Sequence, residues 1–155
     1  MPVADDVELG EGVIIYHPEL VNLYGCAIGR DTTIAPFVEI GRGVRVGSRC
    51  KISTHSYLCM GVTIEDEVFI GHGVMFVNDL DPPAALDGRR VSIEERTLLP
   101  ILVRRNASIG SGVVILGGVT IGAEALVGAG AVVTRDVADG SVVAGVPARL
   151  LRQRS

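Results

Sequence analysis

Residues 109–133 read IGSGVV-ILGGVT-IGAEAL-VGAGAV-V, a run in which an aliphatic residue returns at every sixth position. A small or branched residue stands four places after each of these, and glycine often follows the aliphatic residue directly. A period of six fits neither an amphipathic helix nor a long two-faced strand. It predicts short strands joined by turns, in which one bulky and one small residue of each unit point inward.

The same repeat covers most of the chain in two runs. Its aliphatic positions are Ile28, Ile34, Ile40, Val46, Ile52, Leu58, Ile64, Ile70 and Phe76, and then Val103, Ile109, Ile115, Ile121, Val127 and Val133. The runs are out of phase, because the 27 positions from Phe76 to Val103 are not a multiple of six. We therefore expect residues 77–102 to leave the repeat as an excursion loop, and loops of this length are usually functional or disordered.

This pattern resembles the hexapeptide-repeat acyltransferase family. The resemblance implies an all-β solenoid, a left-handed parallel β-helix with three hexads in each triangular coil. The handedness comes from the family, since parallel strands are ordinarily joined by right-handed crossovers. We expect a single domain with an irregular N-terminal cap coil at 1–27, β-helix at 28–76 and 103–138, and a C-terminal cap at 139–155. Residues 148–152 are predicted to form a short C-terminal helix that covers the edges of the last coil.

Composition excludes several other classes of protein. The net charge of −4 argues against a nucleic-acid partner, which would need a broad basic face. No apolar run reaches the length of a membrane span and the N-terminal residues carry no targeting signal, so we expect a cytoplasmic protein without a membrane partner. The three cysteines show no CxxC spacing and are predicted to be reduced thiols of the core.

The segment 109–152 resembles the C-terminal signature of galactoside and maltose acetyltransferases, which use acetyl-CoA as cosubstrate. The resemblance implies three pairs of cofactor-binding residues. They are Ser111 and Ala129 along the pantetheine channel, Thr134 and Arg135 near the adenosine end, and Arg149 and Arg152 beside the phosphates. With Arg154, the last two concentrate positive charge at the end of an acidic chain, as a phosphate-bearing ligand favours. A solvated basic tail is the alternative interpretation.

Residues 54–66 (THSYLCMGVTIED) and 68–79 (VFIGHGVMFVND) resemble one branch of the family. Its members are N-acetyltransferases acting on 3-amino sugars carried by UDP or dTDP, including the UDP-2-acetamido-3-amino-2,3-dideoxyglucuronate enzymes. The resemblance implies a nucleotide-sugar substrate and a homotrimer with active sites between subunits. The branch commonly continues after Asn-Asp with a basic residue and Tyr-Pro-Arg, whereas here the chain continues LDPPA at 80–84. This departure bears on which sugar nucleotide is used.

The residues at the exit of the repeat favour an amine acceptor. In the O-acetylating relatives a histidine at this exit acts as base on a sugar hydroxyl, whereas here Asn78 and Asp79 occupy it. A hydroxyl needs general-base help near neutral pH, while an amine can attack once its ammonium form has lost a proton. We predict that Asn78 orients the amine through its side-chain oxygen and that Asp79 favours or receives the proton. A backbone N–H is the expected oxyanion donor.

Three further residues are candidates for the site. His55 and His72 occupy the fourth and third places of their hexads, where side chains face outward and can meet a neighbouring subunit. We take His55 as a catalytic candidate and His72, with Tyr57, as substrate-binding candidates. A structural hydrogen bond at the subunit interface is the simpler role for either histidine, and His17, in the cap, is a weaker candidate.

The sequence leaves three other functions open. An O-acetyltransferase of a sugar or another small hydroxyl acceptor is the nearest of them. A protein like the zinc carbonic anhydrases of this fold would need three histidine ligands, two of them five apart, whereas His55 and His72 are 17 apart. No metal site is therefore predicted. A non-catalytic β-helix scaffold is the third alternative.

Overall fold

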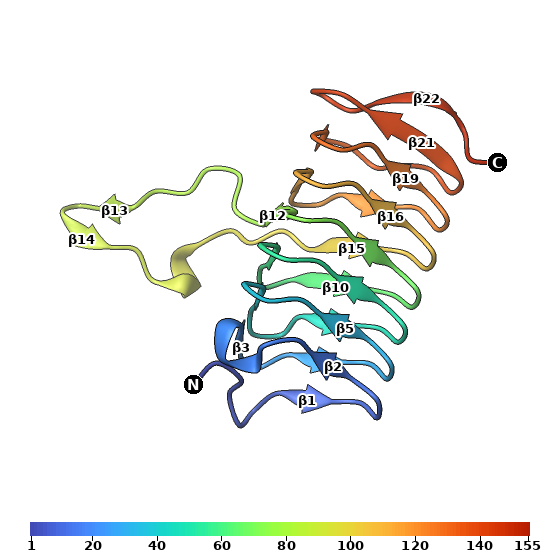
Figure 1. The fold of residues 1–155 in the computed structure, drawn as a ribbon. Helices are drawn as coiled ribbons and strands as arrows, with labels where there is room; N and C mark the ends of the chain where they lie inside the picture. Colours follow the sequence, from blue (N-terminus) through green and yellow to red (C-terminus); the bar gives the residue numbers. More distant parts are fainter.

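Short strands follow one another around the three sides of a prism in the computed structural model, which describes residues 1–155 (Figure 1). The first sheet contains β1 (Glu8–Leu9), β4 (Ala27–Ile28), β7 (Arg45–Val46), β10 (Val62–Ile64), β15 (Ile101–Val103) and β18 (Thr120–Ile121). The second contains β2 (Ile14–Ile15), β5 (Thr33–Ile34), β8 (Lys51–Ile52), β11 (Phe69–Ile70), β16 (Ser108–Ile109), β19 (Leu126–Val127), β21 (Ser141–Ala144) and β22 (Arg149–Gln153). The third contains β3 (Asn22–Leu23), β6 (Glu39–Ile40), β9 (Tyr57–Leu58), β12 (Met75–Val77), β17 (Val114–Leu116) and β20 (Val132–Val133).

The register of the parallel strands shows a β-helix with three hexads in each coil, as the predicted left-handed β-helix requires. Ala27 pairs with Arg45, and Arg45 pairs with Thr63, so 18 residues, or three hexads, complete one coil. The first coil is irregular: Glu8 pairs with Ala27, 19 positions on, whereas Asn22 in the same coil pairs with Glu39, 17 positions on. The short 3₁₀ helix η1 (Pro18–Leu20) lies where this coil departs from the repeat.

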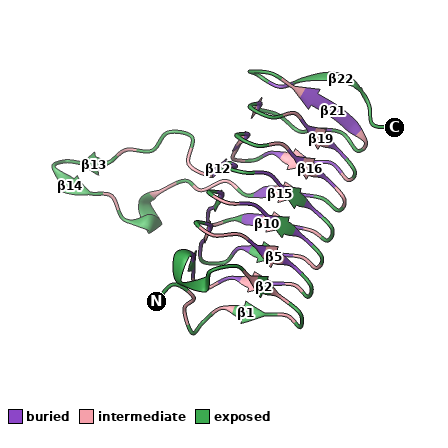
Figure 2. Cartoon of the chain, in the orientation of Figure 1, coloured by how far each residue is buried: buried purple, intermediate pink, exposed green.

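The interior is filled by the aliphatic positions of the repeat. A single cluster of 34 buried residues, almost all Val, Ile, Leu or Ala, runs along the prism, and Phe76 is its one aromatic member (Figure 2). Identical positions stack on one another from coil to coil, so small branched side chains fill the space without large rings. Cys26, Cys50 and Cys59 are free and buried in this cluster, as predicted. Burial raises the pKa of each thiol, that of Cys26 to about 11.

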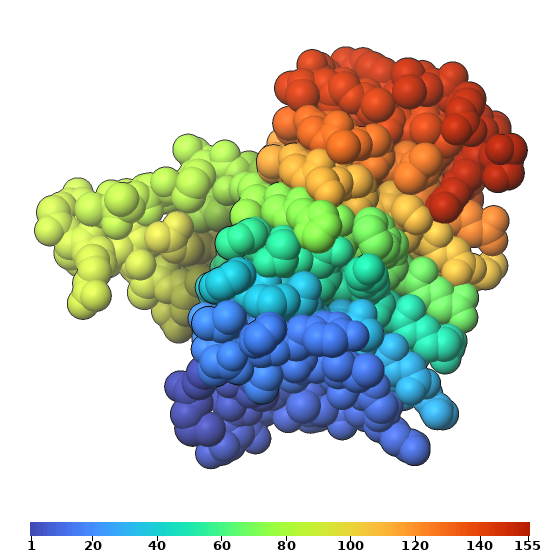
Figure 3. All heavy atoms as spheres, in the orientation of Figure 1, coloured from blue at the N-terminus to red at the C-terminus, as the bar shows by residue number.

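The predicted excursion leaves the prism between β12 and β15 as a long arm, residues 78–100 (Figures 1 and 3). It contains the hairpin of β13 (Ala85–Leu86) and β14 (Arg89–Arg90) and the 3₁₀ helix η2 (Ile93–Glu95). Val62 pairs with Ile101, 39 positions on, so the arm inserts 21 residues into an 18-residue coil and the sheets continue in register.

The C-terminal segment differs from the prediction. Residues 149–153 form strand β22, antiparallel to β21, and not the short helix expected at 148–152. The outer edge of β21 carries backbone groups that need partners, and an antiparallel strand supplies them. A helix of five residues is marginal without such support. The last edge of the second sheet is therefore covered by the chain itself, which turns back alongside β21.

Candidate functional site

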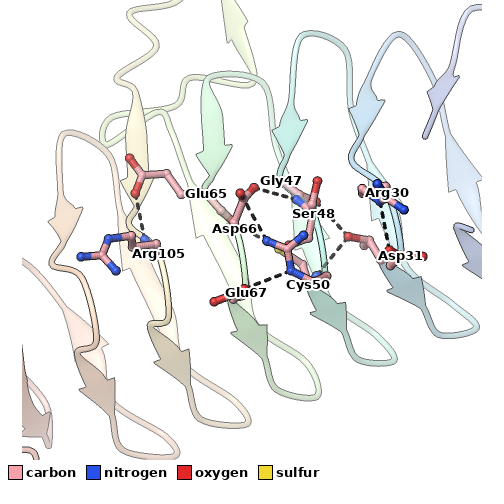
Figure 4. Close-up of polar contacts among 11 residues, drawn as sticks. Arg30, Asp31, Gly47, Ser48, Cys50, Glu65, Asp66, Glu67 and Arg105 are labelled. Atoms are coloured by element: carbon pink, nitrogen blue, oxygen red, sulfur yellow. Dashed lines mark hydrogen bonds and ion pairs between the residues drawn. The ribbon is translucent and has the colours of Figure 1, made fainter. Parts of the chain in front are cut away.

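The turns between the sheets stack into three corners, and the corner between the first and second sheets, here the charged corner, is a ladder of charges (Figure 4). Asp31, Arg49, Glu67, Asn106 and Glu124 occupy equivalent turn positions there, with φ between 55° and 61°. The guanidinium of Arg49 lies 3.0 Å from the Glu67 carboxylate. Exposed pairs of this kind contribute roughly 0–1 kcal/mol each. The side chains of this corner therefore pair with one another along the prism.

The corner between the second and third sheets, here the glycine corner, has a different composition. Gly73, Gly112 and Gly130 occupy the positive-φ positions of its C-terminal half, and no atom lies within 4 Å of the place a Cβ would take at Gly73 or Gly130. The predicted pantetheine residues Ser111 and Ala129 are both exposed on this corner, one coil apart. The open backbone and small side chains leave a shallow track along the prism axis.

The two histidine candidates lie on the same corner. The backbone N–H of His72 donates to the Ser111 hydroxyl at 3.1 Å, so the structure brings these two predicted residues together. The ring of His55 stacks on Phe37, with ring centroids 5.1 Å apart and planes 6° apart. His55 stands one coil before Gly73 at the equivalent position, with φ 63°. The stacked pair therefore ends the glycine track on the N-terminal side.

The corner between the third and first sheets, here the arm corner, contains a cleft of about 320 Å³ beneath the start of the arm. Arg42, Met60 and Asn78 stand at successive 18-residue intervals along this corner. The cleft is lined by Tyr24, Gly41, Arg42, Tyr57, Met60, Asn78, Asp79, Ile93, Arg96 and Leu98. The structure thus places three predicted residues, Asn78, Asp79 and Tyr57, around one space.

Asn78 is held at the exit of the coil by two hydrogen bonds. Its side-chain N–H donates to the carbonyl oxygen of Met60 at 2.7 Å. Its own carbonyl oxygen accepts the N–H of Leu99 at 2.8 Å, which joins the two ends of the arm. With the amide nitrogen engaged, the side-chain oxygen, which has no hydrogen bond within the chain, is the atom left for a ligand.

Asp79 is paired with a residue that the sequence analysis did not identify. Its carboxylate lies 3.1 Å from the guanidinium of Arg96, and its side chain is 13% exposed. The other carboxylate oxygen accepts the N–H of Asp81 at 3.2 Å. Arg96 belongs to the aperiodic part of the chain, where no repeat position could have assigned it to the site.

The two tyrosines form another wall of the cleft. The Tyr24 hydroxyl donates to the Glu39 carboxylate at 3.0 Å, and burial together with this bond raises the pKa of Tyr24 to about 12. Tyr57 projects outward from β9 and is 36% exposed. Burial raises the pKa of its hydroxyl too. Both phenols are therefore neutral near pH 7, and sequence reasoning found Tyr57 but missed Tyr24.

The residues predicted at the adenosine and phosphate end of the cofactor are divided between two places. Arg135 and Arg149 line a second cavity of about 330 Å³ at the C-terminal end of the prism, and Thr134 precedes Arg135 after β20. Arg152 is exposed on β22 and donates to the carbonyl oxygen of Gln153. The guanidinium of Arg154 donates to the Glu124 carbonyl oxygen on the charged corner and so faces away from the glycine corner.

The glycine corner and the arm corner do not meet within one chain. Strand β12 lies between the turn of His72 and the exit at Asn78. The two corners therefore lie at opposite ends of the strands of the third sheet. Tyr57 and Met75 are exposed on the outer face between them.

No three His, Cys, Asp or Glu side chains of the chain gather where they could hold a metal ion. No helix has the length and apolar character needed to cross a membrane.

Two family models match the chain. The bacterial transferase hexapeptide (six repeats) matches residues 100–135, and the hexapeptide repeat of succinyl-transferase matches residues 37–75. Both matches fall on the coils, and residues 78–99 of the arm lie outside them.

Two solved structures similar to this chain are those of acyltransferases. A hexapeptide-repeat-containing acetyltransferase from Vibrio cholerae, solved in complex with acetyl-CoA, is 33% identical, with a TM-score of 0.71 over 88% of this chain and 73% of that one. AntD, an N-acyltransferase from Bacillus cereus solved with dTDP and coenzyme A, is 22% identical and has a TM-score of 0.76 over 96% of this chain and 84% of its own. At that identity the likeness shows the fold alone.

Curated relatives match over a shorter stretch. A 2,3,4,5-tetrahydropyridine-2,6-dicarboxylate N-acetyltransferase from Staphylococcus aureus is 37% identical over 93 residues, which are 60% of this chain and 34% of the relative. The chain thus spans about a third of the length of the curated relatives it matches. The coil register and the likeness to the Vibrio enzyme over most of both chains together show that the chain belongs to the hexapeptide-repeat acetyltransferase family.

Proposed function

We propose that the chain is an acetyl-CoA-dependent N-acetyltransferase that acts on the 3-amino group of a UDP- or dTDP-linked amino sugar. The observation that carries this proposal is the state of Asn78 at the exit of the coil. Its amide nitrogen is engaged by Met60, which leaves its side-chain oxygen to accept a hydrogen bond from an amine. No histidine of the same chain lines the cleft, so an imidazole base for a hydroxyl acceptor would have to come from another subunit.

The glycine corner offers the place for acetyl-CoA. Ser111 and Ala129 flank an open track on which pantetheine can lie along the prism axis. Arg149 stands near the C-terminal end of this track, where its guanidinium can pair with the phosphates of the cofactor. The Vibrio relative, which binds acetyl-CoA, supports the choice of cosubstrate. In this orientation the acetyl end points toward His72 and His55.

Transfer then needs few groups from the protein. The amine nitrogen attacks the thioester carbonyl carbon, the C–S bond breaks, the coenzyme A thiolate leaves, and the amine gives up a proton that the thiolate or water takes. Asn78 orients the amine, and a backbone N–H stabilises the oxyanion. The Asp79 carboxylate accepts one hydrogen bond on each oxygen, from Arg96 and from the Asp81 N–H, and its remaining lone pairs can favour or receive the released proton. His55 and His72 would lie beside the thioester.

The separation of the two corners favours a homotrimer. One chain alone keeps the cofactor track and the acceptor cleft at opposite ends of the third sheet. Exposed Tyr57 and Met75 on the face between them offer apolar area for a second copy. We propose that the glycine corner of one subunit meets the arm corner of the next, so that each active site lies between subunits.

The proposal is tested by offering the protein acetyl-CoA with UDP- and dTDP-linked 3-amino sugars and with their 3-hydroxy counterparts. Mass spectrometry of the products should show one added acetyl group on an amino sugar, and NMR should place it on nitrogen. Acetylation of the hydroxy sugars at a comparable rate would identify an O-acetyltransferase. Absence of acetyl transfer to every amine would refute the proposed activity.

A further inference from the structure

The cleft at the arm corner carries one charge without a partner. Three charged side chains line it, namely Arg42, Asp79 and Arg96. Asp79 and Arg96 neutralise each other at 3.1 Å, and the nearby carboxylate of Glu39 accepts the Tyr24 hydroxyl. The net charge of the lining side chains is therefore that of Arg42.

Arg42 differs from the arginines of the charged corner. Arg30 and Arg49 each lie within about 3 Å of a carboxylate, at 3.1 and 3.0 Å, whereas the exposed Arg42 guanidinium has neither a hydrogen bond nor a salt bridge. Its backbone is nevertheless fixed, because the flanking Gly41 and Gly43 donate to the carbonyl oxygens of Leu58 and Gly25. A guanidinium held beside a cleft with its donors free is suited to bind phosphate oxygens in pairs.

The position of Arg42 relative to Asn78 suggests what it binds. The two residues stand on the same corner, two coils apart, with Met60 between them. Neighbouring strands lie about 4.8 Å apart, so the two positions are separated by about 10 Å along the prism axis. A hexose with its linked phosphates can bridge this spacing, with the amine at Asn78 and the phosphates at Arg42. The exposed ring of Tyr57 lines the same cleft.

We propose that Arg42 binds the diphosphate of a nucleoside-diphosphate-linked acceptor and so selects nucleotide-linked amino sugars over free ones. This inference rests on the proposed acceptor class, but it concerns a separate step, the binding of the nucleotide. The residue acts on affinity for the acceptor and not on the acetyl transfer itself.

Binding of UDP and dTDP to the intact protein tests this directly. Isothermal titration calorimetry would compare wild type with Arg42→Gln and Arg42→Lys. Arg45→Gln is the matched control, because Arg45 is likewise exposed and unpaired but lies on β7, outside the cleft. We expect Arg42→Gln to weaken binding of the preferred nucleotide about tenfold or more, Arg42→Lys to weaken it less, and Arg45→Gln to leave it unchanged. Failure of the wild type to bind either nucleotide, or equal affinities of the two Gln variants, would overturn the proposal.

Steady-state kinetics separate this inference from the proposed activity. Arg42→Gln should raise KM for the nucleotide-linked amino sugar about tenfold, with kcat and the KM for acetyl-CoA nearly unchanged, and should not affect the free amino sugar. If the wild type acetylates the amine but Arg42→Gln does not raise the KM for the nucleotide-linked sugar, the role of Arg42 is contradicted and the proposed activity is not. If the wild type binds nucleotide through Arg42 but transfers no acetyl group, the proposed activity is contradicted and the role of Arg42 is not.

Discussion

The carboxylate of Asp79 lies 3.1 Å from the guanidinium of Arg96, so the first turn of the arm is tied to its last. Both side chains are largely shielded, with 13% and 25% of their surfaces exposed. Removing one partner of a shielded pair leaves the other charge uncompensated, which costs more than the loss of an exposed pair. This contact therefore shapes the wall of the cleft.

The Asp79–Arg96 pair is tested by Arg96→Gln. Without its partner, the Asp79 carboxylate should shift and the arm should lose its anchor, so we expect kcat/KM for the acceptor to fall about tenfold. The affinity for acetyl-CoA, which depends on another corner, should stay the same. Arg104→Gln breaks an exposed contact with Asp139 on the charged corner and is the control. Equal values of kcat/KM in the two variants would show that the Asp79–Arg96 pair does not contribute to activity.

Asn78→Ala tests the orientation of the amine. The variant lacks the side-chain oxygen proposed to accept the substrate N–H, and turnover should fall about tenfold or more. Asn106→Gly, at a positive-φ position on the charged corner, is the control and should retain full activity. Because Asn78 also bonds Met60, the melting temperature of each variant is measured as well. A folded Asn78→Ala protein with unchanged kcat/KM would exclude Asn78 from the mechanism.

Ala129→Gln tests the cofactor track. A long side chain on the glycine corner should obstruct pantetheine and raise the KM for acetyl-CoA about tenfold or more. Ala123→Gln is a close control, because Ala123 holds the same third place of its hexad but lies on the charged corner. The two variants should unfold at similar temperatures and differ in cofactor KM. A similar KM in both would mean that pantetheine does not follow the glycine corner.

The arm carries a carboxyl group with a strongly lowered pKa. Glu95 accepts hydrogen bonds from Arg89 and from the Ser92 N–H, which lower its pKa to about 2. Its contribution to folding is therefore complete above the ordinary pKa of 4.5 and is lost as the pH falls toward 2. In Arg89→Gln the pKa of Glu95 should rise toward its ordinary value. NMR titration of the side-chain carboxyl measures it, and an unchanged value would show that Arg89 is not the main cause.

The repeat made most of the fold predictable from sequence. Each hexad places one aliphatic residue inward, and residues such as Ile109 and Ile115, assigned inward from spacing alone, are fully buried. The C-terminal strand was not predictable in this way. Arg149 and the residues after it lie outside the repeat, and their structure depends on the open edge of β21, which only the assembled prism creates.

The candidate site was predictable only in part. Residues at repeat positions, such as Ser111 and Ala129, could be placed on one corner because 18 residues make a coil. Arg96 and Tyr24 could not, since Arg96 belongs to the aperiodic arm and Tyr24 to the irregular first coil. Their approach to Asp79 and Tyr57 depends on how the arm and the first coil pack against the third sheet.

The most direct test is a crystal structure of the protein with coenzyme A and a UDP- or dTDP-linked 3-amino sugar. We expect pantetheine beside Ser111 and Ala129, and the sugar amine within hydrogen-bond distance of the Asn78 side-chain oxygen, with the two ligands meeting between subunits. Coenzyme A bound away from the glycine corner, or an amine that does not approach Asn78, would contradict this expectation.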